Sequence, residues 1–448
     1  MSGPDHPDGP PGRPGPGPPG RLRRLLLDTK PLRFDRDYRL LWSGQIVSGM
    51  GNQVTRIVLP YQVFTVTHST LAIGALTFVQ LIPILVFSLG AGSLVDAFDR
   101  RRLLMLTQVG LAACSLGLVA LALIPGLPLI LVFAVAFVSA GLGSVDQPAR
   151  SSSIPRLVPP ERLPAAIALN QLNFQAASIV GPAVGGLLIA TVGIAGAYAV
   201  DVVTFGASLA ALVAIAPLPP LGQVTRPGLA AVREGLRFVR SRPVIMSTFA
   251  IDFEAMVFGM PTALFPVLAL DVFGTGPVGF GLLTAAPGAG AFLGALLSGW
   301  VSGVTRAGRA VVFAVFIWGA AIVAFGLATF SFPLALAFLA VAGAADVLSA
   351  VFRSTIVQLE TPDELRGRVT SVHILVVTSG PRLGDLEAAA VASVIGAQAS
   401  VVSGGVLCLL GLAGVVRLFP QLMAHIVPAR RASSSGAAML RSERDDAP

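Results

Sequence analysis

Charged side chains lie inside long apolar runs at several points of the chain. A carboxylate is costly in lipid, so an acidic residue in such a run is a candidate for function. It can bind a proton on one side of a membrane and release it on the other, because burial and a nearby cation act on its proton affinity in opposite directions. Asp252, Glu254 and Asp385 are such residues. We expect one of them to carry a proton in this way, with Asp252 the first candidate and Asp385 the next.

Asp252 and Glu254 lie about ten residues into the same apolar run. Side chains two positions apart on a helix are separated by ~200°, so these two point to nearly opposite faces. One is expected to couple protons and the other to pack against a neighbouring helix. Arg382 and Asp385 are three positions apart and could instead neutralise each other. Asp201, near the end of its run, could simply be solvated.

The first apolar run carries a polar face. Gln45, Gly49, Asn52 and Arg56 follow one another at steps of 4, 3 and 4, which places them on one side of a helix. Within a membrane such a face predicts a water-filled cavity. Acidic cavity residues would favour a cationic substrate, whereas Arg56 and Arg382 would favour an anionic one, and both remain open. The candidate cavity residues are Gln45, Asn52, Arg56, Asn170 and Asn173.

The composition requires a membrane fold to position these groups. Of the 448 residues 54% are hydrophobic and only 12% are charged, whereas soluble domains have about 25% charged residues. In lipid only helices or a closed barrel satisfy the backbone, and the long runs favour helices. About twelve spans are predicted. They cover residues 38–64, 71–95, 103–124, 127–146, 165–190, 195–216, 243–269, 277–301, 309–330, 333–355, 370–395 and 401–423.

The basic residues indicate the orientation. Alternate connections, near residues 65–70, 191–195 and 396–400 for example, contain neither Arg nor Lys, whereas the opposite set is rich in arginine. The positive-inside rule then predicts that both termini are cytoplasmic. The net charge of +8 is accordingly not interpreted as nucleic-acid binding.

An internal repeat divides the chain. Arg150-Ser151 followed by Pro159 recurs as Arg353-Ser354 followed by Pro362, an offset of 203 residues, as in transporters built from parallel repeats. The predicted units are a disordered basic cytoplasmic tail (1–37), a six-helix bundle (38–216), a cytoplasmic linker with an Arg-rich helix (217–242), a second six-helix bundle (243–423) and a disordered tail (424–448).

The turn GSLVDAFDRRRLL, residues 92–104, joins the second and third runs. It resembles the signature loop of the major facilitator superfamily, Gly-x-Leu-Ala-Asp-Arg-x-Gly-Arg-Arg-x-x-Leu. Ala97 and Asp99 replace the usual Arg and Gly, and Val95 replaces Ala. The matching residues are Gly92, Leu94, Asp96, Arg100, Arg101 and Leu104. The resemblance implies two six-helix bundles around a central cavity.

The segment Asp146–Gln171 resembles the entry to the fifth helix in enterobactin-exporter-like members of that superfamily. Asp146 and Arg150 lie four apart on one helix face. The resemblance implies a charged gate that closes the cytoplasmic side; the alternative is plain surface electrostatics. The implied gating residues are Gly92, Asp96, Arg100, Arg101, Asp146 and Arg150.

Residues 177–186 resemble the antiporter motif Gly-x-x-x-Gly-Pro-x-x-Gly-Gly, with Ala177 in place of the first Gly. Small residues give a helix a smooth face, and proline weakens it, so the helix can pack closely and bend. In the superfamily this motif marks exporters of the drug:proton antiporter type. The motif residues here are Gly181, Pro182, Gly185 and Gly186.

These patterns predict an all-α transporter rather than an enzyme. The sequence contains no P-loop, nucleophile elbow or metal-ligand spacing, and no cofactor or metal is expected. The expected partners are a small-molecule substrate, protons and the lipid bilayer. We expect a monomer in the bacterial cytoplasmic membrane that exports a drug, siderophore or secondary metabolite by proton antiport. The alternative is a facilitator or importer with the same fold.

Overall fold

The computed structural model describes residues 28–124, 126, 128–220 and 229–426. At residues 88–93, 96, 229–232 and 302 it describes the backbone but not the side chains. Within these ranges the regular elements are all helices. In the part of the chain that the structure describes, nine helices are long and apolar enough to cross a membrane. The polar helices α2 and α13 are not among the nine, and α6 is counted once although it turns back on itself at Gly193. With these the described chain has the twelve spans that the sequence predicts.

The first half consists of five long helices that make six spans, because α6 makes two. The second half also has six spans. The helices of the first half are α2 (Arg36–Thr67), α3 (Thr70–Ala97), α4 (Arg100–Ala122), α5 (Leu129–Leu157) and α6 (Leu163–Val213). Those of the second half are α8 (Pro243–Phe258), α10 (Gly276–Leu296), α11 (Ala307–Leu327), α12 (Phe332–Glu360), α13 (Arg366–Ile395) and α14 (Ala397–Leu418). Short elements join them: α1 (Lys30–Phe34), η2 (Pro160–Arg162), α7 (Leu229–Ser241), η5 (Ser298–Gly303), η6 (Asp363–Leu365) and α15 (Pro420–Ala424).

The connection predicted near residues 191–195 is confirmed within α6, where Gly193 adopts a φ of 74° that turns the chain back. Two other predicted spans need correction. The fourth span does not end at residue 146, because α5 continues to Leu157 through its polar segment and two prolines. The seventh span is not one helix: α8 ends at Phe258, and the chain continues through η3 (Thr262–Leu264), α9 (Phe265–Val267) and the π-helix η4 (Leu268–Val272).

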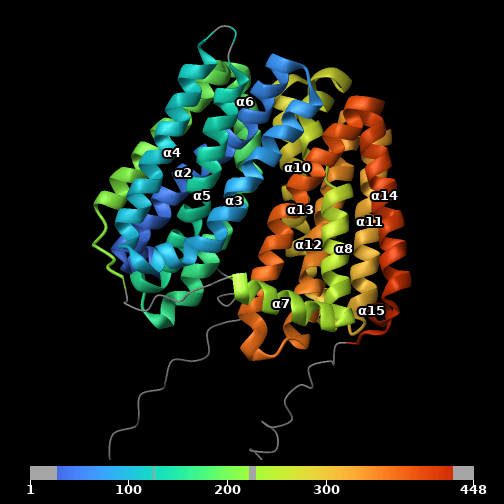
Figure 1. The fold of residues 1–448 in the computed structure, drawn as a ribbon. Coiled ribbons are helices and arrows are strands. Elements are labelled where there is room, and N and C mark those ends of the chain that lie inside the picture. Colours follow the sequence, from blue (N-terminus) through green and yellow to red (C-terminus); the bar gives the residue numbers. More distant parts are fainter. Residues whose placement is uncertain (1–27, 125, 127, 221–228, 427–448) are drawn as a thin grey trace, which may run out of the picture.

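The two halves stand side by side and touch mainly through two helix pairs, α3 with α13 and α6 with α10 (Figure 1). The connections at 68–69, 193, 273–275 and 396 lie at one end of the molecule, which we call the distal end; α7 lies at the opposite, proximal end. Two close approaches between the halves lie in the distal parts of these helices, and a third, between Gly288 of α10 and Ile179 of α6, lies nearer their middle. Gly186 of α6 faces Gly281 of α10, and Gly74 of α3 faces Ala389 of α13.

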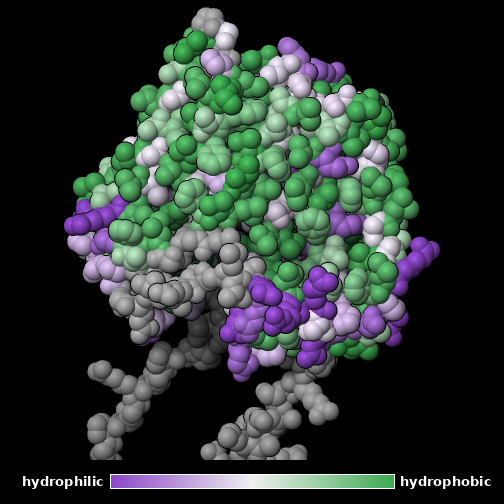
Figure 2. Space-filling model, in the orientation of Figure 1, coloured by the Kyte–Doolittle hydropathy of each residue, from purple (hydrophilic) through white to green (hydrophobic). Residues whose placement is uncertain are grey.

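The outer surface is apolar over most of the helices, and a hydrophilic patch covers α7 (Figure 2). Large apolar side chains point outward along the spans, for example Leu106, Val203 and Phe313, each more than 60% exposed. Soluble monomers rarely expose such continuous apolar surface. The surface therefore fits lipid, and the chain is a multi-pass membrane protein.

Candidate functional site

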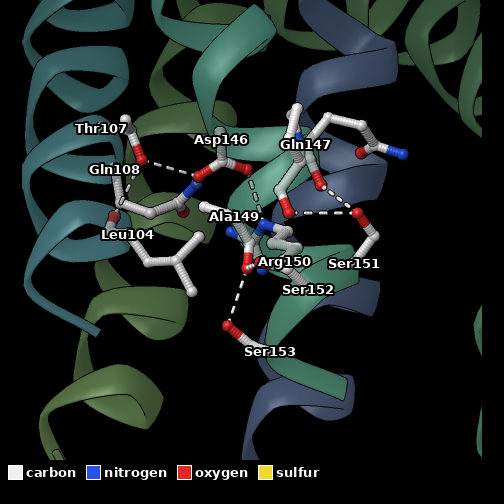
Figure 3. Close-up of polar contacts among 11 residues, drawn as sticks. Leu104, Thr107, Gln108, Asp146, Gln147, Ala149, Arg150, Ser151, Ser152 and Ser153 are labelled. Carbon is white, nitrogen blue, oxygen red and sulfur yellow. Dashed lines mark hydrogen bonds and ion pairs between the residues drawn. The ribbon is translucent and has the colours of Figure 1, made fainter. Parts of the chain in front are cut away.

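Asp146 and Arg150 form a buried ion pair in the first half. They lie one turn apart on α5, with Arg150 Nε 2.6 Å from Asp146 Oδ2. Thr107 and Gln108 of α4 donate hydrogen bonds of 2.8 Å and 3.1 Å to Asp146 Oδ1 (Figure 3). The carboxylate thus has three donors, and the pair links α4 to α5.

The arginine-rich turn contacts the end of α6. Arg101 donates to the carbonyls of Leu212 and Val213, at 2.9 Å and 2.6 Å. Free carbonyls at a helix C-terminus favour a cation. The Arg100 side chain is buried, and the Arg100 N–H donates to the Leu218 carbonyl at 3.1 Å. These contacts place both arginines within the first half.

The two remaining gating candidates, Gly92 and Asp96, belong to α3. Their side-chain positions lie outside the described part of the chain. The gating role of the six residues remains a prediction.

Arg353 forms a second buried charge cluster in the other half. Its Nη2 atom lies 2.8 Å from Asp252 Oδ1 of α8 and 3.8 Å from Asp346 Oδ1 of its own helix, α12. His373 Nε2 of α13 lies 3.9 Å from Asp252 Oδ2. Asp252 is 1% exposed and Arg353 6%. While His373 is neutral, the cluster has one negative charge in excess, which makes it receptive to a cation or a proton.

A pocket of about 190 Å³ adjoins this cluster. Ser354, Gln358 and Thr370 in its wall are exposed, so the pocket connects the buried Asp252 to the outside. Its lining residues are Thr248, Phe249, Asp252, Arg353, Ser354, Val357, Gln358, Thr370 and His373.

Glu254 lies on a different face of α8, as its spacing from Asp252 predicts. A Cβ atom built at Gly411 of α14 would lie 2.4 Å from Glu254 Oε1. Glu254 therefore packs against α14, whereas Asp252 faces α12 and α13. The carboxylate oxygens of Glu254 are buried without a hydrogen-bond partner in the described structure.

Asp385 of α13 binds the broken seventh span. Its Oδ1 atom accepts hydrogen bonds from Thr262 Oγ1 at 2.5 Å and from the Ala263 N–H at 2.8 Å. Arg382 donates to the Thr378 carbonyl on its own helix. Arg382 and Asp385 interact electrostatically, but the closest partners of Asp385 come from the seventh span.

The predicted polar face of α2 is accessible. Asn52 and Arg56 are exposed and Gln45 is partly exposed, whereas the opposite side of the helix packs into the core. Arg56 interacts electrostatically with Asp385 of the other half, so this face is directed toward the second half. On α6, Asn170 is partly exposed and Asn173 is 6% exposed.

The antiporter motif provides close packing of α6 against two other helices. A Cβ at Gly181 would lie 2.4 Å from Gln53 Cβ, and one at Gly186 would lie 2.4 Å from the Pro277 carbonyl oxygen. A Cβ at Gly185 would lie 3.3 Å from Ile57 Cβ of α2. The motif thus allows α6 to approach both α2 and, across the halves, α10. The non-helical residue inside α6 is Gly193 rather than Pro182.

Asp201 differs from its predicted environment. The residue is 1% exposed rather than solvated, and it accepts hydrogen bonds from Thr55 at 2.6 Å and Ser115 at 2.7 Å. The sequence signal for this buried environment was the presence of hydroxyl residues, Thr55 and Ser115, within apolar runs. Asp346, also absent from the predicted site, lies seven positions before Arg353, a two-turn spacing that places both on one helix face.

Comparison with known proteins identifies the class of this membrane protein. Residues 29–436 match the family described as transmembrane secretion effector. The match covers most of the chain, which therefore belongs to this family, within the major facilitator superfamily. The chain is a membrane transporter of the efflux type.

Two proteins that resemble this chain in sequence are enterobactin exporters. The chain is 26% identical over 362 residues to the enterobactin exporter EntS of Shigella boydii serotype 18, covering 80% of this chain and 86% of the relative. The same exporter of Escherichia coli O1:K1 / APEC matches with the same identity and coverage.

Solved structures show the same fold. A bacterial homologue of the human lysosomal transporter Spinster, in an inward-facing and unoccupied conformation, aligns with a TM-score of 0.67 at 16% identity, covering 88% of this chain and 99% of that one. A bacterial homologue of the iron transporter ferroportin aligns with a TM-score of 0.65 at 13% identity, covering 87% and 99%.

Proposed function

We propose that this chain exports a small molecule across the bacterial cytoplasmic membrane by proton antiport, with alternating access of its two halves to either side. The observation that supports this proposal most is the buried Asp252–Arg353 ion pair beside an open pocket. A carboxylate that couples protons must be desolvated yet reachable, and must have a partner that its protonation changes. Asp252 meets these conditions better than Glu254 or Asp385, the other two candidates.

Protonation of Asp252 would redistribute the contacts of Arg353. In the charged state the guanidinium is shared between Asp252 of α8 and Asp346 of its own helix. A proton on Asp252 removes the excess negative charge and leaves Asp346 as the charged partner. The ion pair between α8 and α12 is then weakened, and proton binding is linked to how these helices pack.

The proposed cytoplasmic gate consists of Gly92, Asp96, Arg100, Arg101, Asp146 and Arg150. Arg101 and Arg150 bind partners in their own half, and close contacts at Gly74 and Gly186 join the halves toward the distal end. This arrangement supports a state in which the proximal, cytoplasmic side is open. Asp96→Asn is expected to leave insertion unchanged and to slow transport sharply; unchanged transport would remove Asp96 from the gate.

Gln45, Asn52, Arg56, Asn170 and Asn173 are the proposed cavity residues. A cysteine at position 52 or 56, in a background without Cys114 and Cys408, should react with a water-soluble thiol reagent. Absence of labelling in every condition would assign this face to protein packing. The named substrate of the relatives is enterobactin, so siderophores belong in the first panel of test compounds together with cationic drugs.

The test of proton coupling uses purified protein in liposomes. An imposed pH gradient should drive uphill movement of a substrate found in the panel, and a protonophore should abolish it. Asp252→Asn should lose the gradient-driven movement and retain substrate exchange. Asp271→Asn, an exposed carboxylate on the same span, is the matched control and should behave as the parent protein. Full gradient-driven transport by Asp252→Asn would place the coupling group elsewhere, and downhill flux without coupling would identify a facilitator.

A further inference from the structure

The break in the seventh span leaves backbone groups without helical partners inside the membrane. α8 ends at Phe258, and residues 259–261 are not helical before η3 begins at Thr262. Lipid offers no hydrogen bonds, so a broken helix persists only where protein groups satisfy its free amides and carbonyls.

Two other spans supply these groups. Trp318 Nε1 of α11 donates to the Gly259 carbonyl at 2.9 Å. Asp385 of α13 accepts from both Thr262 Oγ1 and the Ala263 N–H. α13 also lies directly on the end of α8, because a Cβ at Gly384 would lie 2.6 Å from the Met256 and Val257 carbonyl oxygens. The break is therefore held in place largely by α13.

The same turn of α13 forms the contact between the halves. A Cβ at Gly74 of α3 would lie 2.6 Å from Ala389 Cβ and 3.3 Å from the Asp385 carbonyl oxygen. Thr70 Oγ1 donates to the Ala389 carbonyl at 3.1 Å. Asp385 is 7% exposed. Its side chain contacts the break in the seventh span, and its backbone lies against α3 of the first half.

Two arginines surround the charge of Asp385. Arg382 precedes it by three residues on α13, and Arg56 of α2 in the first half acts on the same charge. The two arginines also repel each other across the halves. Thr262 is the hydroxyl donor from the seventh span. The negative charge of Asp385 therefore offsets a repulsion between cations of the two halves, which favours closure of the distal end.

We infer that Asp385 is a positioning residue that couples the break in the seventh span to the distal contact between the halves. Its oxygen fixes η3, and its negative charge attracts Arg56 across the interface. Loss of the charge weakens the distal contact, while loss of the acceptor frees the outer part of the seventh span. This inference rests on the alternating access proposed above, and it does not require Asp252 to couple protons.

The charge and the hydrogen-bond acceptor can be separated by substitution. Asp385→Asn retains an oxygen for Thr262 and Ala263 but removes the charge, whereas Asp385→Ala removes both. Adding Arg56→Gln to Asp385→Asn also removes the repulsion between Arg56 and Arg382, and it leaves the two hydrogen bonds intact. Asp271→Asn is the matched control on the seventh span.

The readout is a distance across the distal end. Spin labels at Leu71 of α3 and Val394 of α13, both exposed, report the separation of the halves in full-length protein without Cys114 and Cys408. We expect Asp385→Asn to raise the ratio of long to short distances on the order of tenfold, within the usual range of coupling between sites. The double variant with Arg56→Gln should return the ratio toward the parent value, because it also removes the repulsion between the two arginines. Asp271→Asn should leave the distribution unchanged.

Three results would overturn the inference. A shift in Asp385→Ala alone, with Asp385→Asn unchanged, would reduce Asp385 to a structural cap. A shift in Asp385→Asn that is undiminished in the double variant with Arg56→Gln would remove the link to the first half, and unchanged distances in all variants would remove both roles. Because the measurement needs no substrate or proton gradient, failure of proton antiport in liposomes would be distinguishable from failure here.

Discussion

Arg150 and Arg353 occupy equivalent positions in the two halves, yet their partners differ. Arg150 binds Asp146 one turn earlier on its own helix, and α4 donates two further hydrogen bonds to that acid. Arg353 finds no acid at the equivalent position, because Ser349 stands there. It instead binds Asp252 across the helix interface.

The difference separates two uses of one repeated residue. The Asp146 carboxylate is saturated by donors from two adjacent helices of one half, so its ion pair stabilises a fixed arrangement. Asp252 has one close cation, a histidine at 3.9 Å and a neighbouring pocket. Its charge can therefore change with fewer compensating bonds lost, which is the property that coupling requires.

The largest expected effect is that of removing Arg353. Arg353→Leu leaves Asp252 and Asp346 buried without their cation, and we expect the free energy of unfolding to fall by about 3–5 kcal/mol. Arg150→Leu should cost less, because Thr107 and Gln108 still donate to Asp146. Thermal denaturation of the purified variants in detergent measures both. Equal losses would show that the two pairs are energetically alike.

An acidic residue introduced at position 349 should make the environment of Arg353 resemble that of Arg150. Ser349→Asp places a carboxylate one turn before Arg353, where it competes with Asp252 for the guanidinium. We expect gradient-driven transport in liposomes to fall severalfold while folding is maintained. Ser349→Asn is the uncharged control for the added volume, because Ser349 is fully buried. If both variants transported equally, sharing of Arg353 would not explain the coupling.

A smaller effect is expected from the donors to Asp146. Thr107→Val removes one hydrogen bond to a charged group, a change of about 1.5–3 kcal/mol in the free energy of unfolding. Because three donors share this carboxylate, the dependence of transport on the pH gradient should stay as in the parent protein. A stability assay and the liposome assay on the same preparation test the two parts separately. Loss of gradient dependence would assign a coupling role to the first site as well.

The smallest effect is expected at His373. Its side chain is 42% exposed, and its Nε2 atom is 3.9 Å from Asp252, so screening by solvent weakens the interaction. His373→Gln should change the free energy of unfolding by less than ~1 kcal/mol and shift the pH dependence of transport only slightly. Complete loss of transport in this variant would make His373, rather than Arg353, the main partner of Asp252.

Features that depend on neighbours along the chain were predictable. Apolar length gave the twelve spans, and the four-residue spacing of Asp146 and Arg150 predicted one shared helix face. The spacing of Asp252 and Glu254 likewise predicted different faces. The glycines of residues 181–186 predicted close packing, since lack of a side chain is a local property.

Only the tertiary structure decided which side chains meet across helices. Asp252 with Arg353, Asp385 with Thr262 and Asp201 with Ser115 each join residues far apart in the sequence. Such pairs depend on how each helix is rotated about its axis and shifted along it, and many packed side chains determine that together. The break after Phe258 has a local signal in Gly259 and Pro261, which both disfavour a continuous helix. Only the tertiary structure shows that Asp385 and Trp318 from other helices satisfy its free backbone groups.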